Sequence, residues 1–151
     1  MDKVKIIGKN KKAFFNYDIL EKIEAGLSLV GTEVKSLKQG RFNFSDAYIK
    51  IENNEAMLVS MNISQYTFGN IINHDPLRKR KLLMHKREIK KLKSKVQEKG
   101  MTLVPTSLYI KKGLIKVEVG VARGKHQYDK RETIKKRDDE RKLKRIMKKF
   151  N

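Results

Sequence analysis

Apolar and polar residues alternate along much of the chain, which predicts a fold built mainly from short β-strands. Near the N-terminus Phe15, Tyr17 and Ile19 occupy every second position, and the pattern continues toward Gly26. A separate apolar run at residues 27–30 predicts another short strand. Each run ends at or beside a glycine, a residue that often marks the end of a regular element.

The middle of the chain predicts a hairpin. Apolar side chains occupy every second position from Ala47 to Ile51, and residues 56–63 form an apolar run that can return alongside them. Between the two runs lies the pair Asn53-Asn54. Asparagine tolerates the left-handed backbone that tight hairpin turns require, so we expect two antiparallel strands here.

The clearest strand pattern lies in the last third of the chain. Residues 102–111 form one strand, Lys112-Gly113 forms a turn, and apolar side chains then alternate from Ile115 to Val121. This is the pattern of a long antiparallel hairpin. Before it, residues 81–84 form a shorter apolar run that predicts a buried strand.

Two stretches have helical spacing. Thr32 can cap a short helix whose apolar residues lie three apart, and Gly40 is placed to end it. Residues 85–99 form a longer and strongly basic helix with a narrow apolar stripe, and Gly100 follows it directly. Such a stripe is suited to docking on the protein's own core.

Taken together, the patterns predict a mainly β fold, an antiparallel barrel of about six strands with two or three short helices. The strands follow one another through local turns and lack the long crossovers that parallel pairing requires. We assign residues 1–123 to this barrel domain and residues 124–151 to a basic C-terminal tail.

The tail differs in composition from the rest of the chain. No apolar residue lies between Ile134 and Leu143, so most of this segment has nothing to pack on a core. Several acidic residues precede a basic residue by four positions, which favours a helix, but an isolated helix of this length is marginal in water. We expect a tail that is disordered when free and helical on an anionic surface; a basic tail that binds nothing specific is the alternative.

Charge is concentrated in three segments. The chain has 37 Lys and Arg against 17 Asp and Glu, a formal charge of +20. Residues 1–12, 78–95 and 123–151 hold 28 of the basic residues and 7 of the acidic ones, which leaves the remainder at −1. The protein therefore reads as a near-neutral body with three cationic attachments and a polyanion as partner. Nucleic acid fits better than an anionic membrane, because the basic helix lacks the bulky apolar face of a membrane-surface helix.

The residue inventory argues against an enzyme. There is no cysteine, and His74, His85 and His126 lie in different elements without ligand-like spacing, so we expect them at the surface or facing RNA and predict no metal site. No carboxylate pair or phosphate-binding glycine loop stands out, and we predict no cofactor. The chain lacks a membrane-length apolar run and a signal peptide, so we expect a cytoplasmic monomer.

Ordered motifs between residues 10 and 131 resemble the small protein B family, also called the SsrA-binding proteins. The matching segments are Asn10-Lys11-Lys12-Ala13 with Tyr17, Glu24-Ala25-Gly26-Leu27, Gly31-Thr32-Glu33-Val34-Lys35-Ser36-Leu37, Asp75-Pro76, Arg80-Lys81-Leu82-Leu83, Glu88-Ile89, Thr102-Leu103-Val104-Pro105, Tyr109, Gly120-Val121-Ala122-Arg123-Gly124-Lys125 and Asp129-Lys130-Arg131. The resemblance implies an oligonucleotide-binding-type barrel that binds the tRNA-like domain of tmRNA and delivers it to stalled ribosomes for trans-translation. It also implies a tail that reaches the decoding centre and mRNA channel of the small subunit.

By the same resemblance, two sets of residues contact the partners. The implied RNA-binding residues are Asn10, Lys11, Lys12, Tyr17, Glu24, Leu83 and Lys116. The implied ribosome-binding residues of the tail are Gly124, Lys125, Tyr128, Asp129, Lys130 and Arg131. His126 stands where the family usually has a second lysine, which puts one cationic contact in doubt.

Alternatives remain for single residues and for the whole chain. On pattern alone Tyr17 and Leu83 read as core, and Glu24 reads as a strand-end carboxylate paired with Lys22 or Lys35. A ribosomal protein or translation factor with an oligonucleotide-binding barrel is the second hypothesis for function. A nuclease of structured RNA is a third, and the missing carboxylate cluster argues against it.

Overall fold

The computed structural model describes residues 3–66 and 73–124. Strands and short helices follow one another through this part of the chain. The elements are β1 (Val4–Lys9), α1 (Lys11–Asn16), β2 (Tyr17–Leu27), α2 (Gly31–Lys38), β3 (Phe42–Asn43), β4 (Tyr48–Glu52), β5 (Glu55–Val59), β6 (Asn62–Ile63), β7 (Arg80–Leu83), α3 (Lys86–Lys99), β8 (Thr102–Lys111) and β9 (Leu114–Gly124).

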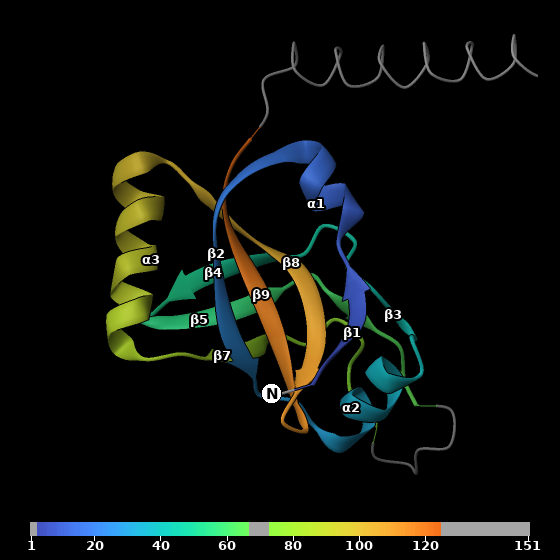
Figure 1. The fold of residues 1–151 in the computed structure, drawn as a ribbon. Helices are drawn as coiled ribbons and strands as arrows, with labels where there is room; N and C mark the ends of the chain where they lie inside the picture. Colours follow the sequence, from blue (N-terminus) through green and yellow to red (C-terminus); the bar gives the residue numbers. More distant parts are fainter. Residues whose placement is uncertain (1–2, 67–72, 125–151) are drawn as a thin grey trace, which may run out of the picture.

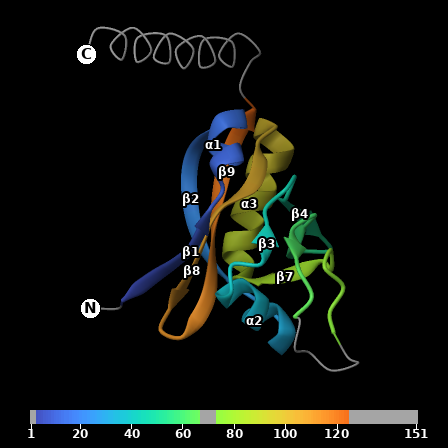
Figure 2. The same cartoon turned by 90° about the vertical axis from the view of Figure 1, so that its right-hand side faces the viewer.

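Seven strands form one antiparallel sheet in the order β1-β8-β9-β2-β7-β5-β4, and β3 pairs with β6 separately. The sheet folds into two layers. β1, β8, β9 and β2 make one layer, and β7, β5 and β4 cross behind it (Figures 1 and 2). Because β4 also contacts β8, the sheet closes on itself. The predicted mainly β antiparallel barrel is confirmed, with more strands than the six expected.

The core fills the space between the two layers and is closed at one side by α3. Fully buried leucines come from both layers and from the helix, among them Leu58, Leu82, Leu92 and Leu108. α3 has 14 residues and begins and ends within one residue of the predicted helix, with Gly100 in the left-handed conformation at φ 62°. Among the described helices, none has the length and apolar character needed to cross a bilayer.

The N-terminal segment differs from its prediction. Residues 11–16 form α1, so Phe15 lies in a helix and the strand begins only at Tyr17. The helix forms because the Asn10 side-chain oxygen accepts a hydrogen bond from the Ala13 N–H, a typical N-cap. Residues 4–9 form β1, which pairs with β8 and was not predicted. Half of the basic segment 1–12, residues 4–9, is therefore part of the sheet.

The segment after β2 also differs. β2 continues through Leu27, and residues 28–30 form no strand. α2 begins at Gly31 rather than after Thr32, because the Glu33 carboxylate accepts a hydrogen bond from the Val30 N–H at 2.9 Å. Gly40 ends this helix as predicted, at φ 72°.

Two further strand predictions need correction, and both hairpin turns are confirmed. The run 56–63 is two strands, β5 and β6, separated at Ser60, whose φ is 64°. β7 alternates between buried and exposed positions instead of being buried throughout. The turns Asn53-Asn54 and Lys112-Gly113 both have positive φ, as their sequences predicted.

A buried ion pair joins α2 to β7. Arg80 Nε donates to Glu33 Oε2 at 2.5 Å, and neither side chain is exposed to solvent. Arg78 Nη2 donates to the other Glu33 oxygen at 2.5 Å, and Arg80 Nη1 donates to the Met61 carbonyl at 2.7 Å. Although burial raises the pKa of the Glu33 carboxyl, the hydrogen bonds from Arg78, Val30 and Arg80 together lower that pKa below its ordinary value.

His74 extends this network and is buried, not exposed as we expected. Its Nε2 lies 2.8 Å from the Ile63 carbonyl and its Nδ1 lies 2.8 Å from the Thr32 hydroxyl. A carbonyl only accepts, so Nε2 carries the proton and, in the neutral ring, Thr32 donates to Nδ1. Thr32 thus fastens the loop before β7 to α2 instead of capping the helix.

Breaking the ion pair should strongly destabilise the protein. We expect Glu33→Gln to lower the free energy of unfolding by about 3–5 kcal/mol, because it leaves the Arg80 charge buried without its counter-ion. Urea unfolding at neutral pH measures this. Glu55→Gln makes the same charge change in an exposed pair with Lys81 and should cost at most about 1 kcal/mol. Equal losses in both variants would contradict the role given to the buried pair.

Candidate nucleic-acid interface

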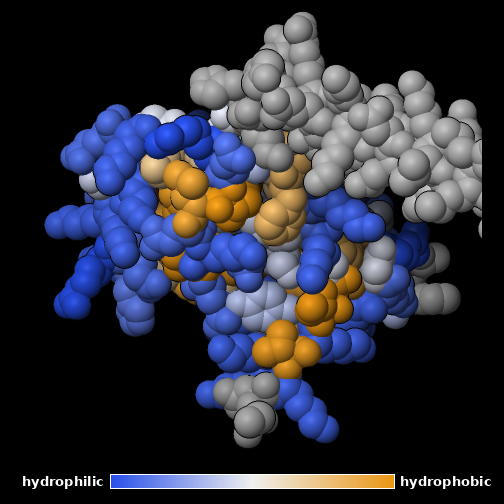
Figure 3. Space-filling view, turned by 45° about the horizontal axis from the view of Figure 1, so that its top comes forward, coloured by the Kyte–Doolittle hydropathy of each residue, from blue (hydrophilic) through white to orange (hydrophobic). Residues whose placement is uncertain are grey.

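The face of the molecule seen in Figure 3 is mainly hydrophilic, with hydrophobic groups exposed among the polar side chains. In the regions 3–66 and 73–124, no group of three or more His, Asp or Glu side chains is arranged to hold a metal ion. Hollows that combine basic, apolar and acceptor groups are the candidates for a functional site. Such combinations are typical of surfaces that bind unstacked RNA bases and phosphates.

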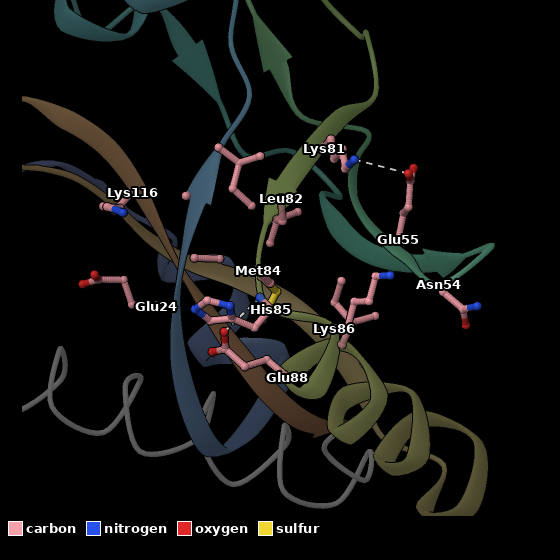
Figure 4. Close-up of a pocket in the computed structure, with 14 residues that line it drawn as sticks. Glu24, Asn54, Glu55, Lys81, Leu82, Met84, His85, Lys86, Glu88 and Lys116 are labelled. Carbon is pink, nitrogen blue, oxygen red and sulfur yellow. Dashed lines mark hydrogen bonds and ion pairs between the residues drawn. The ribbon is translucent and has the colours of Figure 1, made fainter.

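One hollow of about 600 Å³ brings three of the predicted RNA-binding residues together. Glu24 comes from β2 and Lys116 from β9 (Figure 4). Leu83 comes from β7. The strand register explains their meeting, because Gly26 of β2 pairs with both Leu83 and Lys116. Residues more than 90 positions apart thus line one surface.

Leu83 is an exposed apolar side chain at this hollow, not a core residue. Its relative exposure is 57%, and it points outward from β7, whereas Leu82 beside it is buried. A Cβ at Gly26 would lie 3.2 Å from the Leu83 Cβ, so glycine leaves room for this side chain. The arrangement gives the hollow an apolar patch against which a base could pack.

The fold adds basic side chains that were not among the predicted RNA-binding residues. Lys81, His85 and Lys86 line the same hollow (Figure 4). Lys81 lies 3.2 Å from the exposed carboxylate of Glu55, and the Glu88 carboxylate accepts the His85 backbone N–H as an N-terminal helix contact. The sequence showed a basic segment at 78–95 but could not show which of its residues face the hollow.

Glu24 is held as an ionised acceptor. The Tyr109 hydroxyl donates to Glu24 Oε2 and holds the pKa of that carboxyl below its ordinary value. Partial burial opposes this shift, and the ammonium groups of Lys111 and Lys116 reinforce it. Glu24 is therefore paired with Tyr109 and Lys111, not with Lys22 or Lys35. Burial, followed by the Glu24 carboxylate, raises the pKa of Tyr109 in turn.

The remaining predicted RNA-binding residues lie at the other end of β2. Tyr17 begins the strand and Glu24 lies seven residues along it, about 23 Å away at the usual strand rise. Lys11 is exposed on α1, and Lys12 pairs with Asp46 at 2.8 Å. The structure thus divides the predicted residues into two groups.

Within this second group, Asn10 has a structural role. Only 5% of it is exposed, its oxygen caps α1, and its Nδ2 donates to the Pro105 carbonyl at 2.8 Å. Tyr17 is half-buried against a small cluster that includes Ala13. Lys11, Lys12 and the exposed side of Tyr17 are thus the accessible members of this group.

Of the predicted tail residues, Gly124 ends β9 and pairs with Tyr17. The other predicted tail residues lie outside the described part of the chain, as does the predicted helical transition of the tail. They are Lys125, Tyr128, Asp129, Lys130 and Arg131.

Comparisons with known proteins agree on one family. The model of the family described as SmpB protein matches residues 7–149. The SsrA-binding protein of Treponema denticola is 55% identical over 145 residues, 96% of this chain and 94% of the relative. That of Caldanaerobacter subterraneus is 54% identical over 147 residues, 97% and 93% of the two chains. A chain from the solved structure described as "tmRNA-SmpB: a journey to the center of the bacterial ribosome" matches with a TM-score of 0.68 and 44% identity, covering 84% of this chain and 93% of that one.

Removing the Tyr109 hydroxyl should release the Glu24 carboxyl. We expect Tyr109→Phe to raise the pKa of Glu24 toward its ordinary value, because the donor that favours the ionised form is lost while the ring stays in the core. The Glu24 carboxyl carbon shift, followed by NMR through an acid titration, measures the pKa. Tyr48→Phe, on β4, is the control. If Tyr109→Phe leaves the pKa unchanged, the neighbouring lysines set it instead.

Proposed function

The chain belongs to the SmpB protein family, and we propose that it binds the tRNA-like domain of tmRNA and delivers it to stalled ribosomes for trans-translation. The observation that carries this proposal is the match to SsrA-binding proteins, above 50% identity, along nearly the whole length of both chains. This is the role of a non-enzymatic RNA-binding adaptor. It would be carried out in the bacterial cytoplasm, where ribosomes translate.

The hollow beside Leu83 supports the RNA-binding half of the proposal. Lys81, Lys86 and Lys116 can neutralise phosphates, and Leu83 offers apolar surface to an unstacked base. Glu24 repels phosphate, so its value would lie in accepting hydrogen bonds from base amines or a ribose 2′-hydroxyl. The site therefore combines sequence-independent attraction with a selective acceptor.

The second group of predicted RNA-binding residues lies beside the origin of the tail. Lys11 and Tyr17 lie where β9 ends at Gly124, next to the point from which the remaining chain continues. We propose that residues 125–151 face the decoding centre and mRNA channel of the small subunit. Lys11 and Tyr17 would contact the tRNA-like domain together with the hollow at the opposite end of β2.

A gel shift with the labelled tRNA-like domain, against excess unlabelled tRNA at near-physiological salt, tests the proposal. The complex should survive the competitor. Lys116→Ala should weaken it and reduce the salt dependence of binding by about one phosphate contact. Complete loss of the wild-type complex to bulk tRNA would favour the ribosomal-protein hypothesis instead.

Lys99→Ala is the matched control for Lys116→Ala. Lys99 is exposed at the end of α3, about 20 Å along the helix from Lys86 at the hollow. Lys99→Ala removes the same charge as Lys116→Ala and should change the salt dependence of RNA binding less. Equal slopes for Lys116→Ala and the wild type would place Lys116 off the interface.

Deleting residues 125–151 should separate the two halves of the function. Gly124 is retained because it pairs with Tyr17 in the sheet. We expect the affinity for the tRNA-like domain to be largely unchanged and peptide tagging on stalled ribosomes to be abolished, measured by gel shift and by in vitro trans-translation. If the deletion instead abolished RNA binding, the barrel alone would not hold the RNA.

A further inference from the structure

A second hollow of about 470 Å³ lies on the outer face of the four-stranded layer. It crosses the four neighbouring strands β1, β8, β9 and β2, and Glu24 lines both this hollow and the first. Of the residues that line it, Glu24 and Tyr109 belong to the matching motifs. The hollow lies next to the one proposed above to bind RNA.

Exposed apolar side chains border this second hollow. Val4 and Ile6 of β1 are more than half exposed, and Phe14 of α1 is 41% exposed. Two lysines stand beside them: Lys9 also lines the hollow, and Lys22 Nζ lies 5.3 Å from the centre of the Phe14 ring. An aromatic ring next to lysine is the combination on which nucleic-acid-binding proteins stack bases and hold phosphates.

Two carboxylates face each other at the hollow. Glu24 and Glu118 are direct partners across β2 and β9, an arrangement that is destabilising for like charges. Within the described part of the chain, the charge of each carboxylate is compensated at one of its two oxygens. Tyr109 and Lys111 contact Glu24 Oε2. Thr106 and Lys22 contact Glu118 Oε1.

The other oxygen of each carboxylate is therefore an available acceptor. Among residues 3–66 and 73–124, the hydrogen bonds and ion pairs of Glu24 fall on Oε2 and those of Glu118 on Oε1. Glu24 Oε1 on β2 and Glu118 Oε2 on β9 therefore remain available as acceptors. The hydroxyl groups of Tyr109 and Thr106 hold the two side chains in place. A protein of charge +20 thus places two oriented acceptors on the face proposed to meet RNA.

We infer that this hollow binds one unstacked guanine nucleotide of a single-stranded RNA segment. Guanine is the RNA base whose Watson–Crick edge carries two neighbouring donors, N1–H and the N2 amine, which match two acceptors. Its ring would pack on Phe14 and Ile6, and its phosphates would meet Lys9 and Lys22. Any other base leaves an acceptor without a donor, which weakens its binding. The inference rests on the proposed RNA-binding function and adds a base preference to it.

Short RNAs test the inference without tmRNA. We would measure the binding of the full chain to a five-nucleotide RNA with one guanine among uridines by fluorescence anisotropy, and compare it with inosine, which lacks the N2 amine, and with adenine. We expect about tenfold weaker binding of the adenine RNA, which lacks the two neighbouring donors, and a smaller loss for inosine, which keeps N1–H.

Variants assign the preference to Glu118. Glu118→Gln should remove it, because the amide presents a donor where the carboxylate presented an acceptor. Glu98→Gln, at the exposed end of α3, makes the same charge change and should keep it. Phe14→Leu leaves the charge unchanged and should weaken binding of the guanine RNA at least about fivefold through lost stacking.

The outcomes separate the inference from the proposed function. A wild-type protein without guanine preference, or a Glu118→Gln variant that retains it, would overturn the inference. If the tRNA-like domain still survives tRNA competition in the gel shift, the proposed function stands in either case. Unchanged RNA binding in both Phe14→Leu and Glu118→Gln would mean that this face serves something other than RNA.

Discussion

The ion pair between Glu33 and Arg80 holds the strand on which closure of the barrel depends. β7 connects the two layers, yet it pairs with β2 and with β5 through only two residue pairs each. Arg80 anchors its first residue to α2 and to the Met61 carbonyl. One and three positions further on, Lys81 and Leu83 turn outward into the hollow. A buried pair seldom adds much net stability over apolar packing, so its value here is in fixing β7.

Carboxylates are few in this basic protein, and their placement carries much of its chemistry. Lysines attract any RNA through its phosphates, which gives affinity without choice. Glu24 and Glu118 sit among those lysines, each oriented by a hydroxyl group. On the proposed RNA face they would lower the general attraction and favour an RNA that presents donors at the right place. Selectivity would therefore come from the acidic side chains on a basic surface.

The sequence predicts an element of the fold where residues close together in the chain are enough to specify that element. The hairpin of β8 and β9 and the end of α3 at Gly100 were confirmed, because turn residues and period alone specify them. α1 was missed because the alternation from Phe15 to Ile19 continues through it, while the cap at Asn10 decides the outcome. β1 was missed because a lysine-rich segment becomes a strand only by pairing with β8.

Less of the candidate site than of the fold could be predicted from the sequence. The resemblance selected Glu24, Leu83 and Lys116, and the register of β2 brings them together, although their contact with RNA remains a prediction. Lys81 lay in a matching motif but was not among the predicted RNA-binding residues. Nothing in the sequence separated Lys86 from the other basic residues near it, since facing a hollow is a property of the fold. Phe14 and Glu118 carried no motif and emerge only from the shared face of four strands.

β9 has a mechanical consequence. From Lys116 beside the first hollow to Gly124 at its end, it spans eight residues, about 26 Å at the usual rise of a strand. β8 and β2 pair with it on both sides along most of that length, so it can neither bend nor stretch freely. It therefore fixes the distance between the hollow and the point where residues 125–151 begin. Two partners gripped at its ends would be kept at a fixed separation, and changing that separation would require remodelling three strands together.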